Sequence, residues 1–132
     1  MKSLKLGESL NEMIDIELPF PPSGNHFWKH SGSSHYITAK GEKYLRQIQW
    51  IIASKGMRYK LSKRLEVEVI FFPPNKRRFD LDNMIKVLND CLTKSGVWED
   101  DSLIDMLHLI RGPKIVGGKV RVKIAEAGEI FS

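Results

Sequence analysis

The segment Leu65–Phe72 restricts the possible folds of this chain more than any other part of the sequence. It first alternates apolar and acidic residues and then becomes wholly apolar, a pattern typical of a strand in the middle of a sheet. Pro73 and Pro74 follow directly and end the strand, because proline has no N–H to donate to a neighbouring strand. We therefore expect a sheet in which this segment is a central strand.

Three further segments have strand patterns. Residues 13–18 alternate and predict a strand with one exposed face, and residues 103–111 predict another. Residues 119–124 alternate strictly between cations and aliphatic residues, and Gly117-Gly118 before them is a turn signal. We expect residues 119–124 to be the final strand of a hairpin.

Two segments between these strands have the spacing of amphipathic helices. The first begins after Thr38, a preferred N-cap residue, although Gly41 stands where a capping box has Glu or Gln. Gly56 ends it, and its apolar residues recur at spacings of three and four: Tyr44, Leu45, Ile48, Ile51 and Ile52. The second runs from about Asp82 to Lys94, and its buried side is expected to carry Leu81, Met84, Ile85, Leu88, Cys91 and Leu92.

The order β-α-β-α-β-β predicts a two-layer α+β domain, with two helices packed on a mixed sheet. We expect residues 1–132 to form one domain, with residues 1–11 as a frayed lead-in. No stretch has the roughly 20 apolar residues of a membrane span, and we expect no signal peptide. The single cysteine, Cys91, excludes an internal disulfide and indicates a small apolar residue on a helix of a reduced, cytosolic protein.

The loop after the central strand combines basic and acidic residues, since Lys76, Arg77 and Arg78 precede Asp80 and Asp82. Guanidinium and ammonium groups suit phosphates, and clustered carboxylates suit a hard divalent cation. The combination favours metal-assisted chemistry on a phosphodiester. Helix capping is the alternative explanation for one of the two acids, because carboxylates in a first helical turn satisfy exposed N–H groups.

A second acidic pair, Asp100 and Asp101, follows the second helix. A turn alone explains such a pair, and the sequence does not show whether it meets the first one. Lys86 lies one helical turn beyond Asp82 and on the same face, where an ammonium group can hold a carboxylate or stabilise charge on a phosphate. Asp90, a further turn along, is a candidate partner for Lys86.

The segment between the first strand and the first helix is rich in proline, glycine and serine and predicts a rigid loop. It holds Phe27 and Trp28 next to Lys29, with histidines that include His26 and His30. One interpretation is a loop that faces nucleic acid, with rings for stacking and cations for phosphates. The other is that the two rings close the edge of the core, and the sequence does not distinguish them. The surroundings argue against a helix, and so against a zinc site made by the two histidines.

The formal net charge of +5 fits a polyanionic partner, although many soluble proteins are as basic. A nucleotide-hydrolysing enzyme is disfavoured, because the sequence has no Gly-rich loop that ends in Lys-Ser or Lys-Thr.

Three blocks of the sequence carry a resemblance to a known family. Residues 21–28 are Pro-Pro-Ser-Gly-Asn-His-Phe-Trp, and residues 77–83 are Arg-Arg-Phe-Asp-Leu-Asp-Asn, followed by Lys86. Residues 92–101 begin with Leu and end with Gly-Val-Trp-Glu-Asp-Asp. In this order and spacing the blocks resemble the RusA family of Holliday junction resolvases, small endonucleases that prophages frequently encode. The resemblance extends over about residues 13–126.

The resemblance implies that Asp80, Asp82 and Asp101, with Asp100 beside them, bind the metal and that Lys86 is the catalytic lysine. It further implies a homodimer that binds four-way DNA junctions and, with Mg²⁺, nicks two strands symmetrically in DNA recombination and repair. We expect Mn²⁺ to be able to substitute for Mg²⁺. We expect the protein to act in the cytoplasm of a bacterial or phage-infected cell.

The residues expected to bind DNA are Lys76, Arg77, Arg78, Asn25, Trp28, Lys29 and His30. One position departs from the family, which often has a third basic residue where this chain has Phe79. Phe79 puts a phosphate contact at this position in doubt, and the alternative role for its ring is to stack on a base. The alternative function is a non-catalytic accessory protein that binds branched DNA, and it would keep its function in a chelator.

Overall fold

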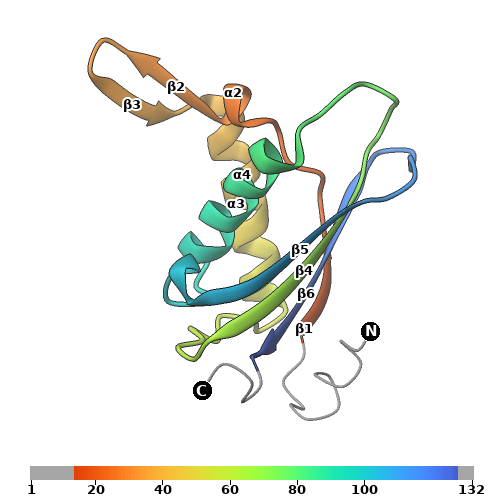
Figure 1. The fold of residues 1–132 in the computed structure, drawn as a ribbon. Helices are drawn as coiled ribbons and strands as arrows, with labels where there is room; N and C mark the ends of the chain where they lie inside the picture. The colour runs from red at the N-terminus through yellow and green to blue at the C-terminus, as the bar shows by residue number, and fades with distance from the viewer. Residues whose placement is uncertain (1–13, 128–132) are drawn as a thin grey trace.

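The central strand of the sheet is β4 (Leu65–Phe72), as the sequence predicts. The computed structural model describes residues 14–127, so the expected lead-in over residues 1–11 lies outside the described residues. The sheet is mixed and has the strand order β1 (Ile14–Leu18), β6 (Lys119–Glu126), β4, β5 (Ile104–Arg111). Helices α3 (Ala39–Ser54) and α4 (Leu81–Lys94) lie on one of its faces (Figure 1). This is the expected two-layer α+β fold.

The predicted hairpin between the last two strands is wrong. β5 pairs with β4 in parallel, whereas β6 pairs antiparallel with both β4 and β1. The turn at Gly117 and Gly118 forms, with positive φ at both residues, but the chain there crosses from one side of β4 to the other. Burial explains this order. The aliphatic residues of β6 are buried, whereas Leu107 and Ile110 of β5 remain exposed at the edge of the sheet.

Helix α3 (Ala39–Ser54) begins where the sequence predicts, and the side chain of its N-cap Thr38 accepts a hydrogen bond from the Gly41 N–H at 3.0 Å. The structure also explains the incomplete capping box. A Cβ on Gly41 would lie only 2.6 Å from the carbonyl oxygen of Phe27, so no Glu or Gln side chain fits there. Gly56 follows the helix at a φ of 66°, which favours glycine and ends the helix.

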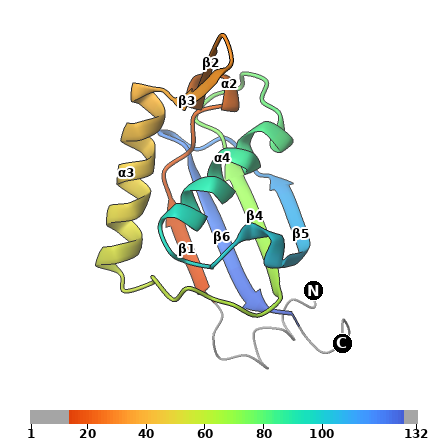
Figure 2. The same cartoon turned by 90° about the vertical axis from the view of Figure 1, so that its left-hand side faces the viewer.

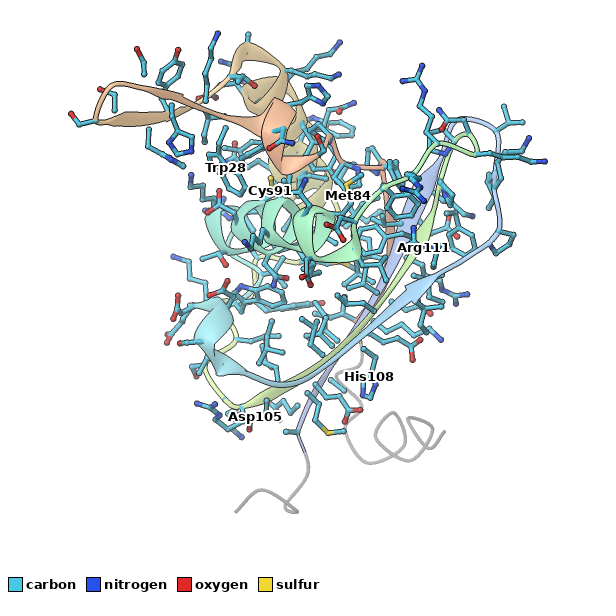
Figure 3. All side chains as sticks on the ribbon, turned by 45° about the horizontal axis from the view of Figure 1, so that its top comes forward. Trp28, Met84, Cys91, Asp105, His108 and Arg111 are labelled. Carbon is cyan, nitrogen blue, oxygen red and sulfur yellow. The ribbon has the colours of Figure 1, made fainter. Side chains whose placement is uncertain are left out.

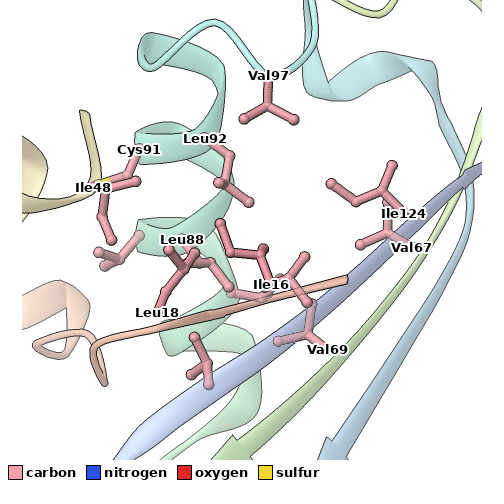
Figure 4. Packing of buried hydrophobic residues seen from close by; sticks show 14 of the residues in the cluster. Ile16, Leu18, Ile48, Val67, Val69, Leu88, Cys91, Leu92, Val97 and Ile124 are labelled. Atoms are coloured by element: carbon pink, nitrogen blue, oxygen red, sulfur yellow. The ribbon is translucent and has the colours of Figure 1, made fainter. Parts of the chain in front are cut away.

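Helix α4 (Leu81–Lys94) connects β4 to the parallel strand β5, and α3 packs beside it (Figure 2). Its apolar side chains interleave with those of α3 and of the covered face of the sheet (Figure 4). Cys91 lies fully buried in this core, and burial is the main cause that raises the pKa of its thiol to about 12. The thiol is therefore protonated at neutral pH, as expected for a core residue.

The expected rigid loop before α3 is wrong, because this segment forms a short helix and a hairpin. They are α2 (Gly24–Phe27), β2 (Trp28–Ser31) and β3 (Ser34–Ile37). Gly32 and Ser33 make a two-residue turn between the strands, and this dipeptide is a hairpin signal that the sequence analysis missed. The hairpin projects from the body of the molecule (Figure 1).

Within residues 14–127, no helix has both the length and the apolar character needed to cross a membrane.

Candidate functional site

The candidate site lies where β4 and β5 end and α4 begins, and we call this the active-site end of the molecule. Loop 73–80 connects β4 to α4 there, and the Asn75 side chain accepts a hydrogen bond from the Arg77 N–H at 2.9 Å. Such a side-chain bond two residues along the chain stabilises a turn. Lys76, Arg77 and Arg78 are all exposed. Among residues 14–127 none of these three cations forms an ion pair.

The two carboxylates at the start of α4 are also exposed. Asp80 is the N-cap residue, and its backbone carbonyl accepts hydrogen bonds from the N–H groups of Asn83 and Met84, both at 3.1 Å. Its side chain, however, makes no capping hydrogen bond. Side-chain capping therefore does not account for this carboxylate, which leaves it available to another ligand. Asp82 lies in the first helical turn, where the helix dipole favours an anion.

Lys86 lies one turn further along α4 and is exposed. Asp90 does not pair with it. Instead the Asp90 Oδ2 atom lies 3.2 Å from the Lys94 Nζ atom. Within the described part of the chain Lys86 has no ion-pair partner, so its ammonium group faces solvent near the first acidic pair.

Phe79 is partly buried and does not lie free to stack on a base. Its ring packs edge-on against Phe20, with 5.5 Å between the ring centroids, and lies 6.4 Å from the ring of Phe71. These contacts make Phe79 part of the core edge, so the expectation that it might stack on DNA finds no support in its packing.

Arg111 is a residue of this end that the sequence analysis did not single out. It is the last residue of β5, and its guanidinium lies 4.3 Å from the centroid of the Phe79 ring. The parallel pairing of β4 with β5 brings it there, opposite Phe71, and no local sequence signal predicts that pairing. Figure 3 shows Arg111 at this end of β5 and Asp105 toward its other end.

The second acidic pair does not join the first within one chain. Asp100 and Asp101 lie between the C-terminus of α4 and the start of β5, whereas Asp80 and Asp82 lie at the opposite ends of both elements. A helix of 14 residues is about 20 Å long, and a strand of eight residues is of similar length. The single acidic nest suggested by the sequence is therefore wrong for an isolated chain.

Asp100 has a local role at its position. Its side chain accepts hydrogen bonds from the backbone N–H and the hydroxyl group of Ser102, which caps the short 3-10 helix that begins at Asp101. The turn explanation thus accounts for Asp100. The Asp101 side chain is exposed.

The residues of one chain fit a divalent cation only in part. No group of three or more His, Cys, Asp or Glu side chains suited to a metal occurs within residues 14–127. Asp80 and Asp82 nevertheless offer two exposed carboxylates beside the exposed cations of loop 73–80. One or two carboxylates, with water and substrate phosphates, are an ordinary ligand set for Mg²⁺. Asp101 lies too far away to complete the set within the same chain.

The expected DNA-binding residues before α3 lie on the same end of the molecule. Asn25 is exposed on α2, and Lys29 and His30 are exposed on β2. Helix α2 packs against the start of α4 so closely that a Cβ on Gly24 would clash with the Asn83 side chain. The structure therefore places α2, the hairpin and loop 73–80 at the same end of the molecule (Figure 1).

The interpretation that the ring closes the core holds for Phe27, whereas Trp28 is partly open to solvent. Phe27 is fully buried and belongs to the core, whereas Trp28 is only partly buried and packs edge-on against it. His30 faces His35 across the hairpin, with 3.2 Å between their Nδ1 atoms. His26 lies on the helix that ends at Phe27, so His26 and His30 do not share a helix face.

Comparison with known proteins identifies the family to which this chain is similar. Residues 19–125 match the family model Endodeoxyribonuclease RusA. The chain is 43% identical over 109 residues to the crossover junction endodeoxyribonuclease rusA of Enterobacteria phage HK97, which covers 83% of this chain and 91% of that protein. It is 32% identical over 113 residues to the protein of the same name from Escherichia coli, and this covers 86% of this chain and 94% of the relative. The corresponding protein of Shigella sonnei is 33% identical over 113 residues, with the same coverage of both chains.

Proposed function

Because this chain belongs to the RusA family of endodeoxyribonucleases, we propose that it resolves four-way DNA junctions by two symmetric nicks and that it requires Mg²⁺ for cleavage. Mn²⁺ would replace Mg²⁺, since both prefer carboxylate and water ligands. The reaction belongs to DNA recombination and repair, in the cytoplasm of a bacterial or phage-infected cell. The observation that carries the proposal is the exposed Asp80 carboxylate, which makes no capping hydrogen bond. It lies beside Asp82 and a loop whose cations form no ion pair within residues 14–127.

Asp80 and Asp82 would hold the metal ion against the phosphate that is cut. The bound ion supplies a water of lowered pKa and offsets negative charge on the phosphate. Lys86, one turn along the same helix face, would donate to an oxygen of that phosphate and stabilise the charge that develops there. Lys86 is well placed for this because no carboxylate within residues 14–127 neutralises it.

Lys76, Arg77 and Arg78 would bind phosphates on either side of the cut. Phosphate contacts fix the register of the strand but carry no sequence information, which suits an enzyme that selects a branched structure. Asn25, Trp28, Lys29 and His30 would contact the DNA from α2 and the hairpin. Their position on the same end of the molecule as loop 73–80 supports this assignment.

Asp101 would complete the metal site of a second copy of the chain. A two-fold symmetric dimer in which each Asp101 approaches the Asp82 of its partner would complete two equivalent sites. The separation of about 20 Å along α4 supports this arrangement, because one chain alone does not bring the two residues together. A four-way junction has two strands to cut, and two-fold symmetry provides one site for each.

The first experiment compares Asp80→Asn with Asp15→Asn on a synthetic four-way junction with Mg²⁺. Asp80→Asn is expected to lower the nicking rate by about two orders of magnitude or more, because the change removes a ligand charge at the reacting phosphate. Junction binding should remain or tighten, since a repulsive charge is lost. Asp15 lies on the sheet and pairs with Arg121, so its variant should cut normally.

Full nicking by Asp80→Asn would overturn the proposed site. A chelator provides a second criterion, because it should abolish cleavage by the natural chain and leave junction binding intact. A protein that binds branched DNA without cutting it would produce no nick under either condition.

The second experiment mixes two inactive chains, Asp82→Asn and Asp101→Asn. If the partner subunit supplies Asp101, each mixed dimer has one site with both changes and one intact site. Half of the dimers in an equal mixture are mixed, so nicking should return to about a quarter of the natural rate, as single nicks. If each chain builds its site alone, the mixture should stay inactive, which would reject the shared site and leave the Asp80 result unaffected.

A further inference from the structure

Arg111 is held in a fixed position at the active-site end. Its Nη1 atom donates a hydrogen bond to the carbonyl oxygen of Phe79 at 3.0 Å, and its guanidinium stacks on the Phe79 ring at 4.3 Å. The ring is itself fixed between Phe20 and Phe71. A guanidinium held by a hydrogen bond and a cation–π contact loses little further freedom when it binds a ligand.

The charge of Arg111 has no counter-charge in the part of the chain that the structure describes. Two other arginines that contact the sheet do have one: Arg121 pairs with Asp15 at 2.7 Å, and Arg64 pairs with Asp105. Arg111 instead donates a hydrogen bond to a neutral carbonyl group, and Arg111 is exposed to solvent. Its remaining N–H groups are thus directed to solvent with their charge unneutralised.

A hollow of about 440 Å³ opens next to this guanidinium, and its lining residues are Arg78, Phe79, Asp80 and Arg111. The lining combines two guanidinium groups with the carboxylate assigned above to the metal. Asp80 alone would repel a DNA phosphate, and the two arginines offset that repulsion.

We infer that Arg111, together with Arg78, binds the DNA phosphate adjacent to the one that is cut. This inference rests on the proposed function, since the site of cutting is defined by Asp80. A guanidinium donates two parallel N–H bonds to the oxygens of one phosphate, which fixes its orientation as well as its position. Arg111 is therefore a positioning residue that sets the strand against the first acidic pair, and Phe79 is the support that orients it.

The test measures junction binding without any divalent metal, over a series of salt concentrations, in the Asp80→Asn background so that no cutting intervenes. Arg111→Met is expected to weaken binding about tenfold at low salt and to make the slope of log K against log salt less negative by about 0.9. Arg111→Lys keeps the charge and should restore most of the slope but only part of the affinity. Arg121→Gln, which changes a paired arginine, should bind like the parent chain.

A second readout assigns the contact to one phosphate. Junctions with a single neutral methylphosphonate at each position around the cut should lose affinity for the parent chain at the adjacent phosphate. Arg111→Met should lose clearly less affinity there, because only the Arg78 contact remains to be removed. An unchanged salt slope in Arg111→Met, or equal sensitivity of both chains at every position, would overturn the inference. Failure of the proposed function would instead show as nicking by Asp80→Asn, which leaves these binding measurements unaffected.

Discussion

One face of the sheet is covered by no helix of residues 14–127 (Figure 1). This face and the active-site end are both rich in charge, but their charged side chains are paired differently. On the uncovered face, which we call the outer face, cations and carboxylates pair across neighbouring strands: Arg121 with Asp15, Lys119 with Glu17, Lys123 with Glu68 and His108 with Glu66. At the active-site end, Lys76, Arg77, Arg78, Lys86 and Arg111 have no ion-pair partner within residues 14–127. Among residues 14–127, the charges of the outer face are therefore largely neutralised, whereas the active-site end carries unneutralised positive charge.

This difference indicates which cations are available to a ligand. Exposed ion pairs contribute only about 0–1 kcal/mol each to the free energy of unfolding, so pairing on the outer face chiefly neutralises that surface. An unpaired cation gains no such stabilisation from a carboxylate, and it attracts a phosphate without first losing a partner. The comparison predicts that changes at the active-site end alter DNA cleavage and binding, whereas changes on the outer face alter stability slightly.

The largest effect is expected for Lys86, with Lys94 on the same helix as a matched control. Lys86→Met should lower the single-turnover nicking rate about 100-fold at saturating enzyme, because it removes a charge that stabilises the reacting phosphate. Lys94 pairs with Asp90 at 3.2 Å, and Lys94→Met should cut at nearly the natural rate. Equal rates for the two variants would show that pairing does not distinguish the two lysines.

A smaller effect is expected in DNA binding for the cations of loop 73–80. The double variant Arg77→Gln, Arg78→Gln should reduce the slope of log K against log salt by about 1.8, since each lost phosphate contact removes about 0.9. Binding constants measured at salt concentrations from about 50 to about 200 mM give this slope. The double variant Lys119→Gln, Arg121→Gln on the outer face carries the same change in charge, and a similar loss of slope there would remove the distinction between the two regions.

The smallest effect concerns the pH dependence of stability on the outer face. A hydrogen bond from Arg121 lowers the pKa of Asp15 below its ordinary value of 3.8, although partial burial opposes the shift. The native state thus keeps this carboxylate charged at a lower pH than the unfolded state does. Its stabilising contribution is complete above about pH 4 and is lost as the pH falls through the native pKa.

Asp15→Asn should therefore lower the free energy of unfolding by a few tenths of a kcal/mol at pH 7 and by less at pH 3, since the pair is partly exposed. Urea unfolding at the two pH values measures the difference. A variant that loses equal stability at both values would show that the ion pair contributes nothing through its charge.

Local patterns in the sequence located most of the elements. The N-cap at Thr38 and the glycine stop at Gly56 bounded α3 correctly, and the alternation in Leu65–Phe72 identified the central strand. These signals succeed because capping and periodicity involve residues within a few positions of each other. The hairpin at residues 28–37 was missed because the abundance of proline and glycine nearby outweighed its Gly32-Ser33 turn signal.

No local pattern specified which strands pair with one another across long distances in the sequence. The sequence favoured a hairpin of the last two strands, but burial of Val122 and Ile124 placed β6 between β1 and β4. That order leaves β5 at the edge in parallel with β4, which brings Arg111 to Phe79. A residue 31 positions beyond Asp80 has no local signal that links it to that carboxylate.

The sequence by itself determined the kinds of groups this protein carries: a basic loop, two acidic pairs, a lysine one turn from the first pair, and a buried thiol. Only the tertiary structure decided which of them meet, because β4 and β5 both run toward the active-site end and α4 returns the chain between them. That path puts Arg111 beside Asp80 and sends Asp101 to the opposite end of α4. Spacing along a chain fixes neighbours within a helix or turn, but distances between elements depend on how the apolar faces pack.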